Sequence, residues 1–208
     1  MKLYLTPTAC SMAADIVARE AGIPLELVWV DVRAKKLKDG SDYYRINPKG
    51  QVPTLQTDDG QFITEGSVIV QYLADSRPCT SLLPSALSLD RYRVLEWLSF
   101  ISSELHKGFT PLFRATTPPP YRDIAIENLC KRFSWLDEVL AERAYLHGGA
   151  FTVADAYCYT IVMWSQVHQI DLSKWPHLTA YLERIGQRPS VRAARAAETQ
   201  EMAARVPA

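Results

Sequence analysis

The segment Asn47-Pro48-Lys49-Gly50-Gln51-Val52-Pro53 stands between two different groups of predicted strands and helices. Its first four residues are typical of a turn, and Pro53 opens a strand, a position that proline tolerates. If the bond before Pro53 is cis, the N–H and C=O of Val52 turn into a cleft, where an extended peptide can pair with them in strand fashion. Only about 5% of X–Pro bonds are cis, so this segment by itself is a weak indication of function.

On the N-terminal side of this segment the sequence predicts a strand, a helix and a second strand. Residues 2–6 and 25–30 are rich in residues that favour strands, and an amphipathic helix opens at Ser11 and stops at Gly22. A strand, a helix and a strand so close in sequence indicate a right-handed βαβ unit with parallel strands.

On its C-terminal side, two short strands at 53–56 and 61–64 flank Asp59-Gly60, which is a strong hairpin signal, and a helix follows at 66–75. Beyond it the strand signals vanish. The sequence thus predicts an α/β domain at 1–78, a linker at 79–88 and an all-helical domain at 89–208. Helical spacing occurs at 89–107, 121–142, 153–168 and 175–187, with one last helix after Ser190.

The composition is that of a soluble globular protein. The chain has 208 residues, of which 48% are apolar and 22% charged, and its 23 basic residues balance its 23 acidic residues. Such a balance argues against a nucleic-acid partner bound through phosphate neutralisation. No apolar run is long enough to span a bilayer, and the first residues lack the apolar core of a signal peptide, so we expect a cytoplasmic protein without a membrane partner.

Four cysteines occur, at Cys10, Cys79, Cys130 and Cys158, and their spacing fits neither a zinc site nor a CxxC redox pair. We therefore expect free thiols and no bound metal. Cys10 differs from the others because it lies between a predicted strand and a predicted helix. Backbone N–H groups and the helix dipole favour an anion there and lower the pKa of a thiol. A small buried cysteine in a loop explains this position equally well.

Two further motifs lie at predicted helix starts. Glu65 precedes Gly66, where a carboxylate can approach bare backbone N–H groups while Glu65 holds an ammonium, an arrangement that suits an amino-acid head group. An acid that stabilises its own helix is at least as common an explanation. Thr152 and Asp155 form a capping box, which is a folding feature.

A polar stripe crosses the first helix of the helical half. Ser99, Ser103 and His106 have the spacing i, i+4 and i+7, which places them on one face of an α-helix. Such a stripe lines a cleft, or it is simply the solvated side of the helix.

The order of these motifs resembles the cytosolic glutathione transferase superfamily and, within it, the beta class of bacteria. The resemblance covers nearly the whole chain; residues 47–53 and 151–155 are specific for the superfamily, and Cys10 and His106 for the class. It implies the glutathione transferase fold, with a thioredoxin-like N-terminal domain for glutathione and an all-α C-terminal domain for a small apolar electrophile. It also implies a homodimer that serves in detoxification and uses glutathione as co-substrate without another cofactor.

The resemblance also implies individual roles. Cys10 matches the cysteine that forms a mixed disulfide with glutathione, and His106 closes the site as a second catalytic residue. Two positions depart from the family: Gly66 replaces a frequent serine, and Ser99 replaces a longer amide. The implied glutathione-binding residues are Cys10, Lys35, Val52, Glu65, Gly66, Ser99, Ser103, Glu104 and His106, some of them reaching across a dimer interface, and the implied second-substrate residues are Phe109, Phe113 and Trp164.

Two other functions compete with conjugation of glutathione to apolar electrophiles. One is a glutathione-dependent thiol–disulfide oxidoreductase, which a lone Cys10 restricts to a monothiol mechanism. The other is a non-catalytic ligand-binding protein of the same fold, against which the joint presence of Lys35, Glu65 and His106 argues.

Overall fold

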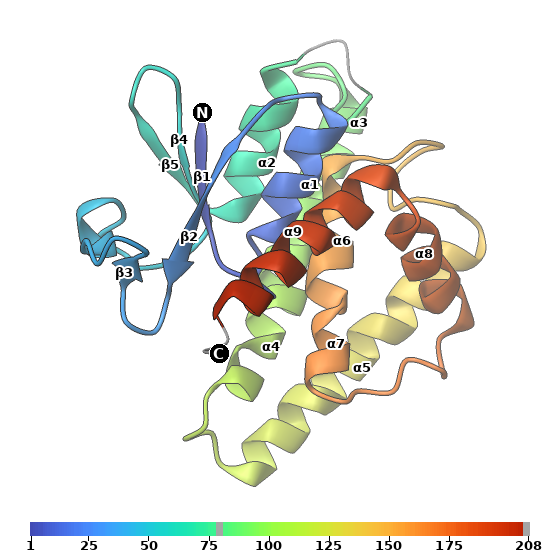
Figure 1. The fold of residues 1–208 in the computed structure, drawn as a ribbon. Coiled ribbons are helices and arrows are strands. Elements are labelled where there is room, and N and C mark those ends of the chain that lie inside the picture. Colours follow the sequence, from blue (N-terminus) through green and yellow to red (C-terminus); the bar gives the residue numbers. More distant parts are fainter. Residues whose placement is uncertain (78–80, 206–208) are drawn as a thin grey trace. The chain divides into compact units, whose positions relative to one another are not determined.

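The structure, a computed structural model, describes residues 1–77 and 81–205 (Figure 1). It contains two compact units, one formed by Met1–Leu82 together with Arg188–Ala208 and the other by Leu83–Gln187. Of the predicted linker at 79–88, the first two residues lie outside the described ranges, and Cys79 is one of them. Within the described ranges, no helix is both long and apolar enough to cross a membrane.

The first unit is built on a five-stranded sheet with the order β3-β2-β1-β4-β5. β1 and β2 are parallel, whereas the other neighbouring strands are antiparallel, which confirms the predicted βαβ unit and the hairpin after it. The two-residue strand β3 is too short to leave a pattern and was not predicted. The strands are β1 (Lys2–Leu5), β2 (Glu26–Asp31), β3 (Lys36–Leu37), β4 (Thr54–Gln56) and β5 (Phe62–Thr64).

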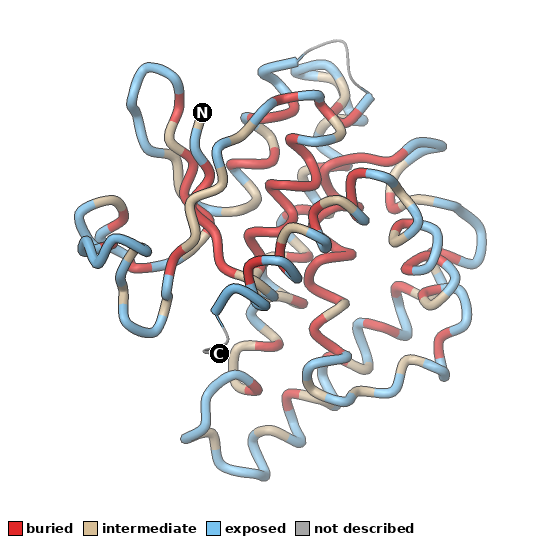
Figure 2. Tube along the Cα trace, in the orientation of Figure 1, coloured by how far each residue is buried: buried red, intermediate tan, exposed pale blue. Residues whose placement is uncertain are grey.

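Two helices, α1 (Met12–Glu20) and α2 (Gly66–Asp75), pack against each other beside this sheet (Figure 1). Seven consecutive residues of α1 are buried, and Figure 2 shows burial concentrated on this helix and the central strands. A second cluster forms around Tyr4, Val30 and Tyr43, the last of which belongs to the short 3₁₀ helix η1 (Tyr43–Arg45).

The C-terminal helix α9 (Pro189–Arg205) belongs to the first unit and contacts α1. The sequence predicted one helical domain at 89–208, whereas residues 188–205 pack with the sheet unit. The reason is a set of three polar contacts to carboxylates. Arg188 pairs with Glu20 at 2.7 and 2.8 Å, Glu198 accepts a hydrogen bond from the N–H of Thr8 at 3.0 Å, and Lys38 pairs with Glu201 at 2.6 Å.

Glu198 makes the stability of this unit depend on pH. Burial raises the pKa of Glu198 from 4.5 to about 7, and the neighbouring Asp15 raises it further, while Arg195 and the Thr8 N–H act in the opposite direction. Because the folded pKa is raised, this group contributes stability that is present below about pH 4.5 and lost as the pH rises through 7. In urea unfolding, we expect the free energy of unfolding of Glu198→Gln, relative to that of the parent protein, to rise by about 2 to 3 kcal/mol between pH 5 and pH 8.5.

Glu201, on the same helix, is a matched control with the opposite sign. Burial alone would raise its pKa, but hydrogen bonds from Lys38 and Arg205 outweigh burial and lower it. The charged Glu201 carboxylate therefore stabilises the protein above pH 4.5. At pH 8.5, Glu201→Gln should be less stable than the parent protein. If both variants respond to pH alike, the charge of Glu198 is not the cause.

The second unit is helical, as predicted. The helix expected at 89–107 continues to Phe113 through a π-helical segment, and Pro111 lies inside its last part. The helix expected at 153–168 is divided at Met163. The elements are α3 (Leu89–Phe100), η2 (Ile101–His106, π-helical), α4 (Lys107–Phe113), α5 (Pro119–Ala141), α6 (Val153–Val162), α7 (Trp164–Val167) and α8 (Pro176–Gly186).

Helix α6 is the core of this unit, since all ten of its residues are buried. The predicted capping box of Thr152 and Asp155 is confirmed. The fully buried Asp155 carboxylate accepts hydrogen bonds from the N–H of Thr152 at 2.8 Å, the N–H of Leu146 at 2.9 Å and the hydroxyl of Tyr181 at 3.1 Å. Asp155 therefore joins the start of α6 to the preceding loop and to α8.

Candidate functional site

Cys10 lies in the loop between β1 and α1, only 9% exposed, and its thiol donates a hydrogen bond to the carbonyl of Val52 at 3.4 Å. Burial raises the pKa of this thiol to about 12, outweighing the N–H of Cys10 itself, which lowers it; the charge of Glu65 raises it further. The expected low pKa is therefore wrong for this structure. Helix α1 begins two residues later, at Met12. The Cys10 sulfur is desolvated, and too few hydrogen-bond donors replace the water to stabilise a thiolate.

The segment 47–53 holds Val52 beside this thiol. The Val52–Pro53 peptide bond is cis. The side chain of Asn47 donates hydrogen bonds to the carbonyl of Gln51 at 2.8 Å and to the hydroxyl of Thr54 at 3.1 Å, and the hydroxyl of Tyr43 donates to the same carbonyl at 2.8 Å. The backbone around Val52 is thus fixed by buried side chains from the preceding turn and helix.

Two charged residues flank this segment. The ammonium of Lys35 donates to the carbonyl of Gly50 at 2.7 Å. The exposed carboxylate of Glu65 pairs with the ammonium of Lys49 at 2.5 Å, so an arriving ammonium group has to compete with Lys49. The sequence predicted Lys49 only as part of a turn, because its partner Glu65 lies beyond the β4–β5 hairpin in the chain.

Three residues of the first unit have a left-handed backbone although they are not glycine. Their φ angles are +62° for Thr8, +57° for Lys35 and +70° for Glu65. Such conformations cost about 1–3 kcal/mol each and gather at functional sites. Thr8 is in the Cys10 loop, and Lys35 and Glu65 are themselves predicted site residues, so the strain coincides with the predicted site.

Gly66 is the first residue of α2, where backbone N–H groups have no partner within the helix. A Cβ atom added there would lie 3.7 Å from the ring of Pro53, an ordinary van der Waals contact. The backbone at this position therefore has room for the Cβ atom of a side chain.

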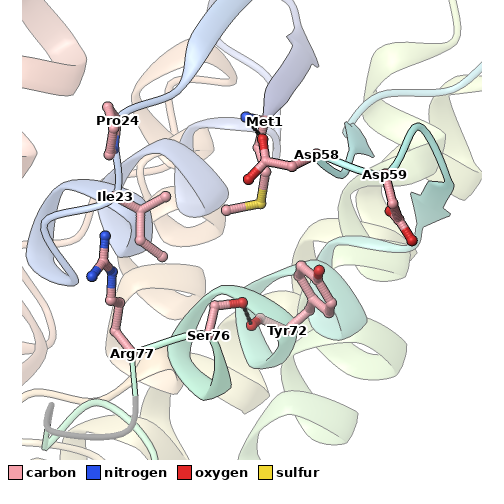
Figure 3. Close-up of a pocket in the computed structure, with 8 residues that line it drawn as sticks. All are labelled: Met1, Ile23, Pro24, Asp58, Asp59, Tyr72, Ser76 and Arg77. Atoms are coloured by element: carbon pink, nitrogen blue, oxygen red, sulfur yellow. Dashed lines mark hydrogen bonds and ion pairs between the residues drawn. The ribbon is translucent and has the colours of Figure 1, made fainter.

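A separate pocket of about 530 Å³ lies in the first unit (Figure 3). It surrounds the N-terminal end of β1, whereas Cys10 follows the C-terminal end of the same strand, where α/β sheets bind their ligands. None of the predicted site residues lines it. The lining residues are Met1, Ile23, Pro24, Asp58, Asp59, Tyr72, Ser76 and Arg77.

In the second unit, three predicted residues lie around a fourth, Trp164. The ring centroid of Trp164 lies 5.0 Å from that of His106, 5.7 Å from Phe109 and 4.9 Å from Phe113. Phe109 is fully buried, Trp164 is 7% exposed and Phe113 is 50% exposed, so Phe113 offers most of the accessible apolar surface. The three second-substrate residues that the resemblance implies, Phe109, Phe113 and Trp164, are thus in contact with one another through Trp164.

Two neighbours of this aromatic group were missed. Tyr157 is hydrogen bonded to Nδ1 of His106 at 2.6 Å, and His168 packs against Phe109 and Phe113. Burial lowers the pKa of His168, and the charge of Arg122 lowers it further. Nothing in the sequence distinguishes Tyr157 from the other buried aromatic residues of its helix.

The predicted polar stripe is only partly present. Ser103 lies inside the π-helical segment, and its hydroxyl donates a hydrogen bond to the carbonyl of Ser99 at 3.0 Å. Because this segment begins between Ser99 and Ser103, the α-helical spacing that placed Ser99, Ser103 and His106 on one face does not apply. Glu104 is paired with Arg132 at 2.7 Å.

The first unit therefore offers a buried thiol, a fixed stretch of backbone, two ammonium groups and a carboxylate. This set suits a short peptide with a thiol, an α-ammonium and free carboxylates. The second unit offers an imidazole in an aromatic, partly exposed setting, which suits an apolar compound. Among the described residues, no group of three His, Cys, Asp or Glu side chains is arranged to hold a metal ion.

Two known protein-family profiles match the chain, one in the first unit and one mainly in the second. Residues 9–76 match the profile of the glutathione S-transferase N-terminal domain, and residues 100–189 match that of the C-terminal domain. Glutathione S-transferase GstA of Escherichia coli O157:H7 is 45% identical over 198 residues, which cover 95% of this chain and 98% of that protein.

Solved structures give the same result. A sphingomonad glutathione S-transferase in complex with glutathione is 43% identical with a TM-score of 0.93, covering 96% of this chain and 99% of that one. A beta class glutathione S-transferase of Sphingomonas chungbukensis is 40% identical with a TM-score of 0.93, covering 95% and 98%.

Proposed function

We propose that the first unit of this chain binds glutathione. The chain belongs to the glutathione transferase family and, within it, to the bacterial beta class, which supports this proposal. The observation that carries this proposal is the contact of the Cys10 thiol with the carbonyl of Val52, where the cysteinyl part of an extended peptide can pair. Glu65 then meets the γ-glutamyl ammonium, with Gly66 at its carboxylate, and Lys35 meets the glycyl carboxylate.

The second unit supplies the groups for catalysis. Glutathione loses its thiol proton on binding, and His106 stabilises the resulting thiolate by a hydrogen bond. Ser99, Ser103 and Glu104 are the other residues of this unit that we propose to bind glutathione. The aromatic group of Phe109, Phe113 and Trp164 takes the apolar electrophile. The thiolate sulfur attacks an electrophilic carbon of this compound and forms a carbon–sulfur bond, while the bond from that carbon to its leaving group breaks and the leaving group departs with the electron pair, as halide does from an aromatic halide. Glutathione is the co-substrate, and we propose that the reaction needs no other cofactor.

A second activity uses Cys10 itself. Its thiolate attacks one sulfur of a glutathione disulfide, forming a mixed disulfide and releasing the other half as a thiolate. The position of Cys10 against Val52 favours this exchange, whereas its raised pKa slows it. Assays of one preparation with an aromatic halide and with a mixed-disulfide substrate measure the two activities side by side, and inactivity in both would contradict the proposal.

Glutathione affinity should depend on Glu65. Removal of a partner from a charged group costs about 1.5–3 kcal/mol, so we expect Glu65→Gln to weaken glutathione binding roughly ten- to a hundred-fold in calorimetry. Glu26→Gln is the control, because Glu26 is also an exposed carboxylate paired with a lysine, Lys2, at 3.2 Å, but lies on β2. Equal affinities for the two variants would remove Glu65 from the site.

We propose that the chain forms a homodimer and acts in the cytoplasm. Exposed apolar side chains support an interface: Val68 and Tyr72 lie one turn apart on α2, and Trp135, 42% exposed, stacks on Trp97. Light scattering at micromolar concentration should report twice the 23.4 kDa of one chain. A fully active species of single mass would contradict the dimer.

A further inference from the structure

The hydrogen bond between Nδ1 of His106 and the hydroxyl of Tyr157 determines what His106 is able to do. We propose that Tyr157 is a positioning residue that donates its hydroxyl proton to Nδ1, so that the ring proton of His106 resides on Nε2. His106 then serves the glutathione sulfur as a hydrogen-bond donor and not as a base. This inference rests on the proposed function of His106 and adds the direction of its hydrogen bonds.

The direction follows from the chemistry of the two groups. A neutral imidazole has one N–H and one bare nitrogen, and the bare nitrogen is much more basic than a phenol oxygen. A phenol, with a pKa of about 10, is in turn a good donor. At 2.6 Å the favourable arrangement is therefore O–H of Tyr157 to Nδ1 of His106, which leaves the proton on Nε2.

The surroundings keep both rings in this arrangement. Tyr157 is 3% exposed and lies in the capped, fully buried helix α6, so its hydroxyl has little freedom to move. The indole of Trp164 meets the imidazole edge-on, with an angle of 72° between the ring planes. His106 is also the last residue of the π-helical segment, a feature that is frequent at functional sites.

The tautomer of His106 determines where the thiol proton of glutathione goes. A neutral imidazole with its proton on Nε2 and its Nδ1 occupied has no free lone pair for the thiol proton. That proton therefore leaves to solvent, and Nε2–H stabilises the thiolate that remains. The role of His106 is electrostatic, in the same way as that of a donor in an oxyanion hole.

Imidazole tautomers can be read directly by ¹⁵N NMR, and the chain contains only four histidines. His106→Phe assigns the His106 signals by their loss. At pH 8 we expect His106 of the parent protein to be protonated on Nε2 and bare on Nδ1. In Tyr157→Phe both tautomers should be present, and kcat for conjugation should fall about three- to ten-fold with little change in KM for glutathione.

Tyr159→Phe is the matched control. Tyr159 lies on the same helix and is 1% exposed, but its hydroxyl lies beside Gly186 of α8. This variant should keep the parent tautomer and kcat.

A parent protein with the proton on Nδ1, or a Tyr157→Phe variant with an unchanged tautomer, would overturn the inference. If the tautomer changes while conjugation does not, the positioning role of Tyr157 stands and the proposed role of His106 in catalysis is overturned.

Discussion

Replacement of Cys10 by alanine is expected to abolish the mixed disulfide with glutathione and to leave much of the conjugating activity. Cys10 is the cysteine beside Val52, whereas Cys158 is fully buried in the second unit. Because burial raises the pKa of Cys10 to about 12, its sulfur is a neutral thiol at neutral pH, and this residue is poorly suited to activate a second thiol. Intact-mass spectrometry after treatment with oxidised glutathione, together with steady-state kinetics, gives the answer, and Cys130→Ala serves as control.

The complementary change is His106→Phe. It should lower the rate of conjugation by roughly ten-fold or more and weaken glutathione binding less, since it removes a hydrogen bond that matters most in the transition state. If Cys10→Ala is inactive in conjugation while His106→Phe is nearly normal, the two roles are reversed and Cys10, not His106, activates the thiol of glutathione.

Asp155→Ala should destabilise the protein by about 4 kcal/mol, because it leaves the donors of Leu146, Thr152 and Tyr181 without their acceptor inside the protein. For a chain of this size such a loss lowers Tm by about 8–16 °C in a thermal melt. Glutathione affinity of the protein that remains folded should be unchanged, because the proposed glutathione residues of the first unit lie on other elements.

Asp171→Ala is the control for this change. Asp171 also accepts hydrogen bonds at the start of a turn, from the N–H and hydroxyl of Ser173, but it is exposed. Its loss should alter stability by no more than about 0.5 kcal/mol. Similar melting of the two variants would show that the capping box of α6 does not hold the second unit together.

Local patterns predicted the elements of this fold well. The Asp59-Gly60 hairpin, the parallel pairing of β1 with β2 and the capping box are all present, because each depends on residues close in sequence. The position of α9 could not be predicted in this way. Its helical pattern reveals a buried side, but only the contacts of Arg188, Glu198 and Glu201 with distant residues decide where it packs.

The site was harder to predict, because it depends on distances across the fold. The pKa of Cys10 was expected from its place before a helix, whereas burial of its sulfur decides the direction of the shift. The partners Lys49 and Tyr157 become visible only when the hairpin and α6 are in place. The π-helical segment likewise leaves no recognisable pattern in residues 101–106.

The division of the chain has a consequence for its synthesis. The residues of the second unit are contiguous, so they can fold as soon as they have left the ribosome. The first unit begins earlier but is finished later, because the side of α1 that contacts α9 stays uncovered until residues 188–205 have been made. The contacts that close it join residues as far apart in sequence as Thr8 and Glu198, so the loop-closure entropy is large and the last step of folding is a long-range one. A nascent chain stalled before α9 therefore leaves Glu20 of α1 without its partners Arg188 and Ser190.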